Sequence, residues 1–161
     1  MLRIVQTFLP YPDAEATAEV LDDRRLGKQR VETLQILRAL TWPEYGWKHH
    51  PAVKMWRGSE VALASYGLVI CRQWVTRGYA DTCAATIVTD LQDAGFDLQL
   101  DATDVAPADF PAWWGDARLH TSHQASLVRK DPSHYRPFFP DVDPDLPCWW
   151  PSQASEFNGG D

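Results

Sequence analysis

The chain has 161 residues, of which 45% are hydrophobic and 23% are charged, and its formal net charge is −7. A chain of this length and composition can bury the core of one domain, which excludes a disordered chain, a collagen-like fibre and a multidomain assembly. Eight tryptophans and twelve prolines are unusual for this length, and because proline interrupts helices we expect helices separated by fixed turns and aromatic loops.

The N-terminal part of the chain predicts an extended segment followed by two helices. Residues 1–12 contain β-branched residues and two prolines, which favour an extended, packed conformation or a short strand. Asp13 can cap a helix over about 14–21, and a break near Asp22 leads into a second helix over about 24–41. The apolar positions of this second helix recur at helical spacing, at Val31, Leu34, Leu37 and Leu40.

The middle of the chain predicts two further helices after a rigid aromatic loop over residues 41–51. Residues 51–79 contain the most apolar helix, and a following helix over about 82–94 ends at Gly95. The buried stripe of the apolar helix is predicted at Val61, Ala64, Leu68, Cys71 and Val75.

The C-terminal part predicts one amphipathic helix and a tail. An acidic loop runs to Trp114, and the helix over 117–130 is stopped by Pro132. We therefore predict an all-α fold, a compact single-domain orthogonal helical bundle over residues 1–140 with a short extended N-terminal segment. Residues 141–161 are predicted to form a proline-rich and then polar tail.

Cysteine usage and the absence of export signals predict the compartment. Cys71, Cys83 and Cys148 are widely spaced, odd in number and without a CxxC pair, which is typical of reduced thiols. The N-terminus is broken by proline too soon for a signal peptide, and no apolar run approaches the roughly 20 residues that span a bilayer. We expect a cytoplasmic monomer that does not associate with a membrane.

Positive charge is concentrated in two segments of this acidic chain. Arg24–Arg30 contains four cations and no acid, whereas Arg118–Arg136 contains four cations, three histidines and one acid. The cations of the first segment are Arg24, Arg25, Lys28 and Arg30. Two narrow basic segments indicate a local anion site better than a broad surface for a polyanion.

The second predicted helix carries a stripe of polar residues on one face. Arg25, Lys28, Glu32 and Gln35 follow one another at spacings of three, four and three residues. Two cations, a carboxylate and an amide in this order can bind a phosphodiester and place one acid beside the sugar. The alternative is a solvated face on which Lys28 and Glu32 form an ordinary salt bridge of a few tenths of a kcal/mol.

The second basic segment interleaves cations with aromatic rings. Lys130 precedes Tyr135 by five residues, and cations that bind phosphates beside rings that stack on bases are typical of nucleic-acid binding. Trp56 and Arg57 form a similar pair earlier in the chain. The alternative is that the cations complement a helix end and the rings belong to the core.

The histidines allow a second chemical interpretation, a zinc site. His49 and His50 are adjacent, and His120 and His123 form an HxxH pair. This pattern lacks nearby cysteines and a second carboxylate, so it indicates zinc only weakly. No nucleotide-binding glycine motif or hydrolase motif occurs, and we predict neither a metal nor a cofactor.

Three segments, 22–37, 50–59 and 120–139, together resemble the pyrimidine-dimer DNA glycosylase family, and most closely its bacterial branch. The branch pattern D-[KR]-x-x-x-K-x-x-x-E-T-x-Q-x-L is matched by Asp23, Arg24, Lys28, Glu32, Thr33, Gln35 and Leu37. The resemblance implies a compact helical domain that kinks duplex DNA and extrudes a nucleotide. It also implies an N-terminal α-amine as nucleophile at the sugar C1′ and a glutamate that stabilises the oxocarbenium-like sugar.

The chain departs from the family's phage enzyme at two positions. Direct alignment gives Arg24 and Arg25 where that enzyme has an Arg-Glu pair, so we take Glu32 as the substitute glutamate. Leu2 is bulky, so we expect Met1 to be retained and to supply any nucleophilic amine. Both departures bear more on lyase chemistry than on DNA binding.

Our hypothesis is a DNA repair glycosylase that excises a damaged pyrimidine-type base, with or without AP-lyase activity. Its predicted catalytic residues are Glu32, Met1 and Arg25. The predicted nucleic-acid-binding residues are Arg24, Lys28, Arg30, Gln35, Trp56, Arg57, His120, His123, Lys130 and Tyr135. Two alternatives stay open: a non-catalytic nucleic-acid-binding module, and an enzyme that acts on free nucleotides or nucleosides.

Overall fold

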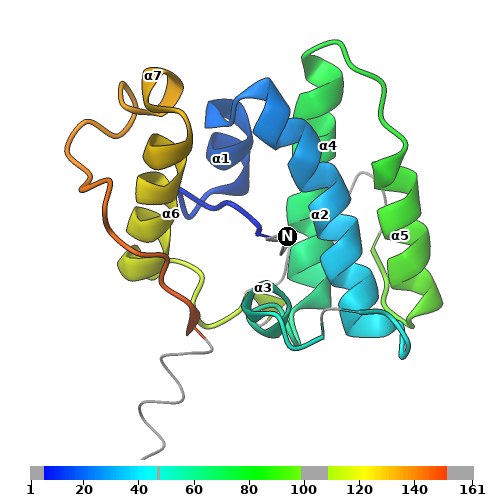
Figure 1. Ribbon diagram of the computed structural model, residues 1–161. Coiled ribbons are helices and arrows are strands. Elements are labelled where there is room, and N and C mark those ends of the chain that lie inside the picture. The colour runs from blue at the N-terminus through cyan, green and yellow to red at the C-terminus, as the bar shows by residue number, and fades with distance from the viewer. Residues whose placement is uncertain (1–5, 47, 99–108, 152–161) are drawn as a thin grey trace, which may run out of the picture.

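The computed structural model describes residues 6–46, 48–98 and 109–151, and over these ranges the chain forms seven helices and no strand (Figure 1). The predicted all-helical fold is confirmed. The helices are α1 (Ala14–Val20), α2 (Asp23–Thr41), α3 (Pro51–Lys54), α4 (Glu60–Thr76), α5 (Cys83–Asp93), α6 (Ala117–Lys130) and α7 (Pro132–Tyr135).

Aspartates cap the starts of four of these helices, and at α1, α2 and α6 they share one geometry. Asp13, Asp22 and Asp116 have extended backbone angles, and each side chain accepts a hydrogen bond from a backbone N–H of the first turn of α1, α2 or α6. These bonds satisfy donors that the helix itself cannot pair. The cap predicted at Asp13 is confirmed, and α2 begins one residue earlier than expected.

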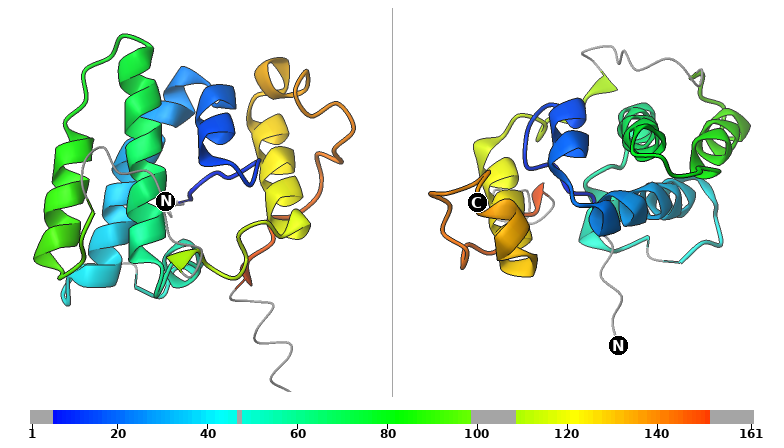
Figure 2. Two further views of the ribbon diagram at one scale, coloured as in Figure 1. Left: turned by 180° about the vertical axis from the view of Figure 1, so that it is seen from behind. Right: turned by 90° about the horizontal axis from the view of Figure 1, so that it is seen from above.

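Helices α2, α4 and α5 lie side by side and form the main body of the molecule, with α1 against α4 (Figures 1 and 2). Two glycines allow α2 and α4 to approach closely. A Cβ atom added at Gly27 would lie 2.8 Å from the Trp74 ring, and one at Gly67 would lie 2.5 Å from Thr33 Cγ2. The short α3 contacts α2, and α4 and α5 run alongside each other (Figure 1).

The predicted apolar stripes of α2 and α4 are partly wrong. Val31 is 38% exposed and Val75 is 54% exposed. The buried residues of α2 are Leu26, Gln29, Glu32, Thr33, Ile36, Leu37 and Ala39. Three of these seven residues are polar. A buried face chosen by hydropathy alone leaves them out and therefore lies to one side of the observed buried face. Val75 lies in the last turn of α4, next to the connection to α5.

Residues 6–12 are extended, without forming a strand, and pass between α6 and the body made by α2 and α4. Buried backbone groups of this segment need partners, and side chains from both sides supply them. Tyr66 Oη lies 2.7 Å from the carbonyl oxygen of Phe8, and Gln124 Nε2 donates to the carbonyl oxygen of Pro10. The segment therefore joins α6 and α7 to the rest of the fold.

All three cysteines are free thiols. Among the helices of the described ranges, none combines the length and apolar character needed to span a membrane.

Candidate functional site

The carboxylate of Glu32 lies just below the surface on α2. The residue is 2% exposed, whereas the side chain of Lys28, one turn earlier, is 54% exposed. Lys28 Nζ lies 3.6 Å from Glu32 Oε1, and Gln29 Nε2 donates to Glu32 Oε2 at 2.9 Å. Glu32 is thus held at the edge between the core and a charged surface.

Gln29 fixes this carboxylate through a buried polar network. Its Nε2 also donates to the carbonyl oxygen of Gln6 at 2.8 Å, and its Oε1 accepts from the Phe8 N–H at 2.9 Å and lies 2.9 Å from Tyr66 Oη. Both polar atoms of the amide are therefore fully used. Burial, together with the negative charge of Glu32, raises the pKa of Tyr66 well above its usual value. Tyr66 thus remains a neutral phenol beside the carboxylate.

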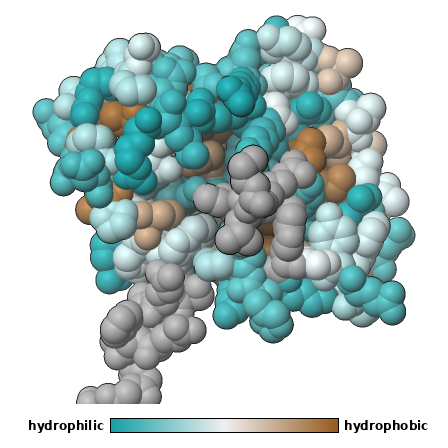
Figure 3. All heavy atoms as spheres, in the orientation of Figure 1, coloured by the Kyte–Doolittle hydropathy of each residue, from teal (hydrophilic) through white to brown (hydrophobic). Residues whose placement is uncertain are grey.

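The two basic segments converge near this carboxylate. Burial lowers the pKa of Lys130, and the positive charges of Arg25, Lys28 and Arg129 lower it further, while the negative charge of Glu32 opposes them. The end of α6 lies near the first turns of α2 because α7, which follows Lys130 directly, is bonded to Asp22 and Val20 through Tyr135 and His134. In Figure 3 most of the surface over α7, α1 and the start of α2 is hydrophilic, with smaller hydrophobic areas between. We call Arg25, Lys28 and Lys130 the cation cluster.

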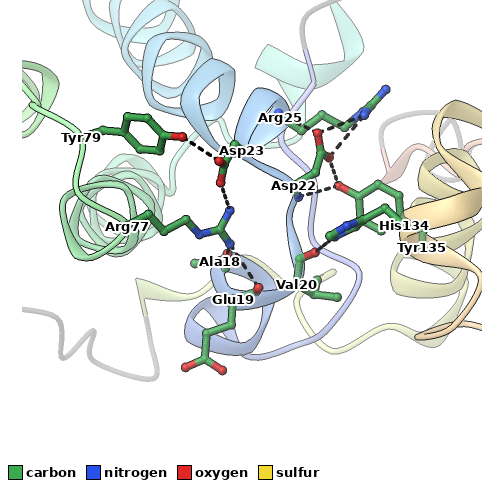
Figure 4. Close-up of polar contacts among 10 residues, drawn as sticks. All are labelled: Ala18, Glu19, Val20, Asp22, Asp23, Arg25, Arg77, Tyr79, His134 and Tyr135. Atoms are coloured by element: carbon green, nitrogen blue, oxygen red, sulfur yellow. Dashed lines mark hydrogen bonds and ion pairs between the residues drawn. The ribbon is translucent and has the colours of Figure 1, made fainter.

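Arg25 is oriented by the residue that caps its own helix. Its Nη1 lies 3.3 Å from both carboxylate oxygens of Asp22, and Asp22 Oδ1 also accepts from the hydroxyl of Tyr135 (Figure 4). Burial acts to raise the pKa of Asp22, but the hydrogen bonds from Tyr135 and Arg25 and the charge of Arg25 outweigh it and lower this pKa. Asp22 is therefore an ionised anchor at the start of α2.

The predicted nucleic-acid ligands His120 and His123 are buried and bind the N-terminal segment instead. His120 Nδ1 donates to the carbonyl oxygen of Leu9 at 2.7 Å, since its Nε2 accepts from the Gly115 N–H. His123 Nδ1 accepts from the Leu9 N–H at 2.9 Å. Burial, and to a lesser degree the charge of His120, lowers the pKa of His123 to about 3. Both rings support the fold rather than face solvent.

Two further predicted ligands are enclosed by the fold. Trp56 is fully buried and donates from Nε1 to Thr7 Oγ1 at 2.9 Å. Tyr135 is also fully buried, so neither ring is open to a stacked base in this structure. Arg30 points to the opposite side of α2, where its guanidinium lies 4.6 Å from the centre of the Trp74 ring and pairs with Asp81.

The remaining predicted residues lie at the surface or outside the described ranges. Arg24 is exposed on the first turn of α2, and Gln35 is half-buried. Arg57 is exposed and donates to the carbonyl oxygen of Lys48, so it braces the 42–50 loop. Met1 lies outside the described residues.

No group of three or more His, Cys, Asp or Glu side chains suited to hold a metal ion occurs among the described residues. His50 instead accepts a hydrogen bond from the Ala52 N–H and begins α3.

The polar network was not foreseen in the sequence. Gln29 lies three residues before Glu32, a spacing that places both on one helix face and could have indicated the contact. Tyr66 carries no such signal, because it reaches the network from α4.

The arrangement places one buried carboxylate 3.6 Å from Lys28 Nζ, with Arg25 one turn before Lys28 on α2 and Lys130 at the end of α6. Cations can bind the phosphates of a nucleic-acid backbone, and a carboxylate held beside them can stabilise positive charge that develops on a sugar. Residues 5–87 match the family model described as pyrimidine dimer DNA glycosylase, whereas comparison with curated proteins and with solved structures gives no match. Because the matched residues make up more than half of the chain and include Arg25, Lys28 and Glu32, the protein belongs to the pyrimidine dimer DNA glycosylase family.

Proposed function

We propose that this protein is a DNA repair glycosylase that excises a damaged pyrimidine-type base from duplex DNA, acting as a monomer. The observation that carries the proposal is the position of Glu32, a nearly inaccessible carboxylate directly beside the exposed Lys28 and close to the opposing Lys130. Purely structural packing favours apolar residues at such a depth, because burying a charge is costly.

In the proposed reaction the cation cluster binds phosphates on either side of an extruded nucleotide. Extrusion costs a few kcal/mol and is least costly at a damaged base. The C1′–N bond then breaks and its electron pair leaves with the base, while the ionised Glu32 stabilises the positive sugar. Water adds at C1′ and its proton passes to the departing base, which completes hydrolysis.

Lyase activity adds a different nucleophile. The Met1 amine would attack C1′ in place of water and lose its protons as the sugar ring opens to an imine. Removal of a C2′ proton then expels the 3′ phosphate and cleaves the strand, and water releases the imine. The N-terminal amine suits this role because a useful fraction is unprotonated at neutral pH.

Excision from a panel of lesion-bearing duplexes tests the glycosylase proposal. Glu32→Gln keeps an oxygen that can accept from Gln29 but removes the negative charge, so we expect excision to slow by about 100-fold to 10,000-fold. Glu44→Gln is the matched control, since Glu44 is exposed on the loop after α2. No abasic product from the unaltered protein across the panel, or equal rates for Glu32→Gln, would contradict the proposal.

Borohydride trapping on abasic DNA and dimer-containing DNA separates the two chemistries. Hydride reduces an imine to a stable amine, so a covalent adduct mapped to Met1 would establish the lyase. Excision without an adduct would leave a monofunctional glycosylase. DNA binding that depends steeply on salt, without turnover, would favour the non-catalytic module instead.

A further inference from the structure

We propose that Tyr135 is a positioning residue that, through Asp22, holds Lys130 beside Arg25 and Lys28, so that two separate basic segments act as one phosphate site. The proposal rests on the proposed DNA-binding function for its biological meaning. Its structural basis is a contact between the end of the α6–α7 unit and the start of α2, which no sequence motif links.

The Tyr135 hydroxyl makes two hydrogen bonds to a single residue. It donates to the carboxylate of Asp22 and accepts from the backbone N–H of Asp22 at 3.0 Å. The carboxylate that receives this bond also caps α2 and pairs with Arg25. The Tyr135 hydroxyl is therefore hydrogen-bonded to the same carboxylate that orients Arg25 of the cation cluster.

Tyr135 has little freedom to move away from this contact. Its ring is fully buried and stacks on Phe139, with ring planes 9° apart. His134, the preceding residue, donates from Nε2 to the carbonyl oxygen of Val20 at 2.8 Å (Figure 4). Two neighbouring side chains of α7 therefore bind the corner where α1 ends and α2 begins.

Lys130 is carried by the same unit. It is the last residue of α6, and Asp131 then ends α6 and caps α7, accepting from the His134 N–H. The Asp131 N–H in turn donates to the carbonyl oxygen of Leu127. With no flexible linker between Lys130 and Tyr135, fixing the tyrosine also fixes the backbone that presents the lysine.

We call the contact between Tyr135 and Asp22 the clamp. It holds together cations that repel one another. Arg25, Lys28 and Arg129 all act on Lys130 in the direction that disfavours its positive charge. Like charges repel, and without a bound anion this repulsion, which the negative charge of Glu32 partly offsets, favours moving α6–α7 away from α2. A structural contact that holds the cations together before an anion arrives preorganises the site for phosphate.

The chain contains a matched control on the other side of the same corner. Asp23, next to Asp22, accepts from Tyr79 Oη at 2.7 Å and from Arg77 Nη1 at 2.8 Å (Figure 4). Tyr79 follows α4 and lies away from Lys130. Tyr79→Phe thus removes an equivalent tyrosine–aspartate hydrogen bond without touching the cation cluster.

The test compares Tyr135→Phe with Tyr79→Phe in binding a fluorescently labelled abasic-analogue duplex over a range of salt concentrations. Each phosphate contact contributes about 0.9 to the slope of log K against log salt. We expect Tyr135→Phe to lower the magnitude of this slope by about 1 and Tyr79→Phe to leave it unchanged. A slope unchanged in both variants would overturn the proposal, because loss of a merely stabilising contact does not alter the number of phosphates bound.

A second measurement does not depend on DNA. NMR titration of the Lys130 side chain should show its pKa rising toward the ordinary lysine value in Tyr135→Phe, as the neighbouring cations move away. If Tyr135→Phe does not fold, Asp22→Asn replaces it, since asparagine also caps helices, with Asp23→Asn as control. A Lys130 pKa unchanged in the folded variant contradicts the clamp. If the unaltered protein does not bind DNA, the proposed function is wrong. The titration of Lys130 still tests whether the Tyr135–Asp22 contact positions Lys130.

Discussion

The buried imidazole of His123 links the ionisation of one residue to the stability of the whole chain. Its Nδ1 accepts from the Leu9 N–H, so the neutral ring carries its hydrogen on Nε2, which has no hydrogen-bond partner among the described residues. Protonation would place a charge in this site without a counter-ion. The folded protein therefore keeps the ring neutral far below the pH at which an exposed histidine becomes charged.

We predict that the free energy of unfolding falls by about 2 kcal/mol between pH 7 and pH 5 because of His123 alone. The pKa of His123 is about 3 in the folded protein and about 6.5 in the unfolded chain. The unfolded chain therefore binds a proton first, so this stability is complete above about pH 6.5 and is lost as the pH falls. Urea unfolding at pH 5, 6 and 7 measures the effect.

Two variants isolate the contribution of His123. His123→Asn can still accept from the Leu9 N–H but cannot be protonated, so its unfolding free energy should change less over this pH range. His49→Gln removes an exposed histidine and should leave the pH dependence intact. An identical pH dependence in His123→Asn and the unaltered protein would show that His123 does not titrate as described.

At the scale of single residues, the sequence predicted which side chains share a face of α2 better than it predicted how deeply each of them is buried. The spacing of Arg25, Lys28 and Glu32 correctly places them along one side of α2. Which of them lies below the surface depends on Gln29 and Tyr66, and the latter comes from another helix. His123 shows the same effect, because its burial follows from contact with Leu9, more than a hundred residues away in the chain.

At the scale of elements, the packing of α2 on α4 depends on the absence of a side chain at Gly67. We predict that Gly67→Ala lowers the free energy of unfolding by about 1–3 kcal/mol, since its Cβ would overlap Thr33 Cγ2 and force the two helices apart. Gly46→Ala is the control, because nothing lies within 4 Å of a Cβ at that position. Thermal or urea unfolding of both variants checks the difference.

A second substitution tests the stated cause. Thr33→Ser removes the methyl group that a Cβ at Gly67 would strike, so the double variant Gly67→Ala, Thr33→Ser should recover part of the lost stability. Additive losses in the double variant would mean that a different contact accounts for the effect of Gly67→Ala.

Most helices were predictable from local signals, whereas their mutual arrangement was not. Aspartate caps and helical periodicity placed α1, α2 and α6 within a few residues. The role of residues 6–12 as a connector required contacts with residues far along the chain, which periodicity does not encode. The buried face of α2 was predicted partly wrongly for the same reason, because some of its buried residues are polar.

At the scale of the whole molecule, the proposed function requires a chain of net charge −7 to bind DNA through a small region. We predict a slope of log K against log salt between about −3 and −4, from the cation cluster together with Arg24. Lys130→Ala should reduce the magnitude of this slope by about 1. Arg118→Ala should not, because Arg118 pairs with Asp116 and lies over the Trp149 ring at the other end of α6.

Equal salt slopes for Lys130→Ala and Arg118→Ala would mean that the cation cluster is not the phosphate-binding surface. The convergence of the two basic segments was only partly foreseeable. Charge counting located both segments in the sequence, but the Asp22–Tyr135 contact, which joins residues 113 positions apart, could not be predicted from it.

The central claim is that Lys130 contributes to DNA binding and Glu32 to base excision. It is tested most directly by measuring binding and excision separately on one dimer-containing duplex. Single-turnover rates and dissociation constants are compared for the unaltered protein, Glu32→Gln and Lys130→Ala. We predict that Glu32→Gln binds normally but excises at least about 100-fold more slowly, whereas Lys130→Ala binds more weakly and excises at the normal rate once saturated. A Glu32→Gln variant that excises at the normal rate at saturation would contradict the account.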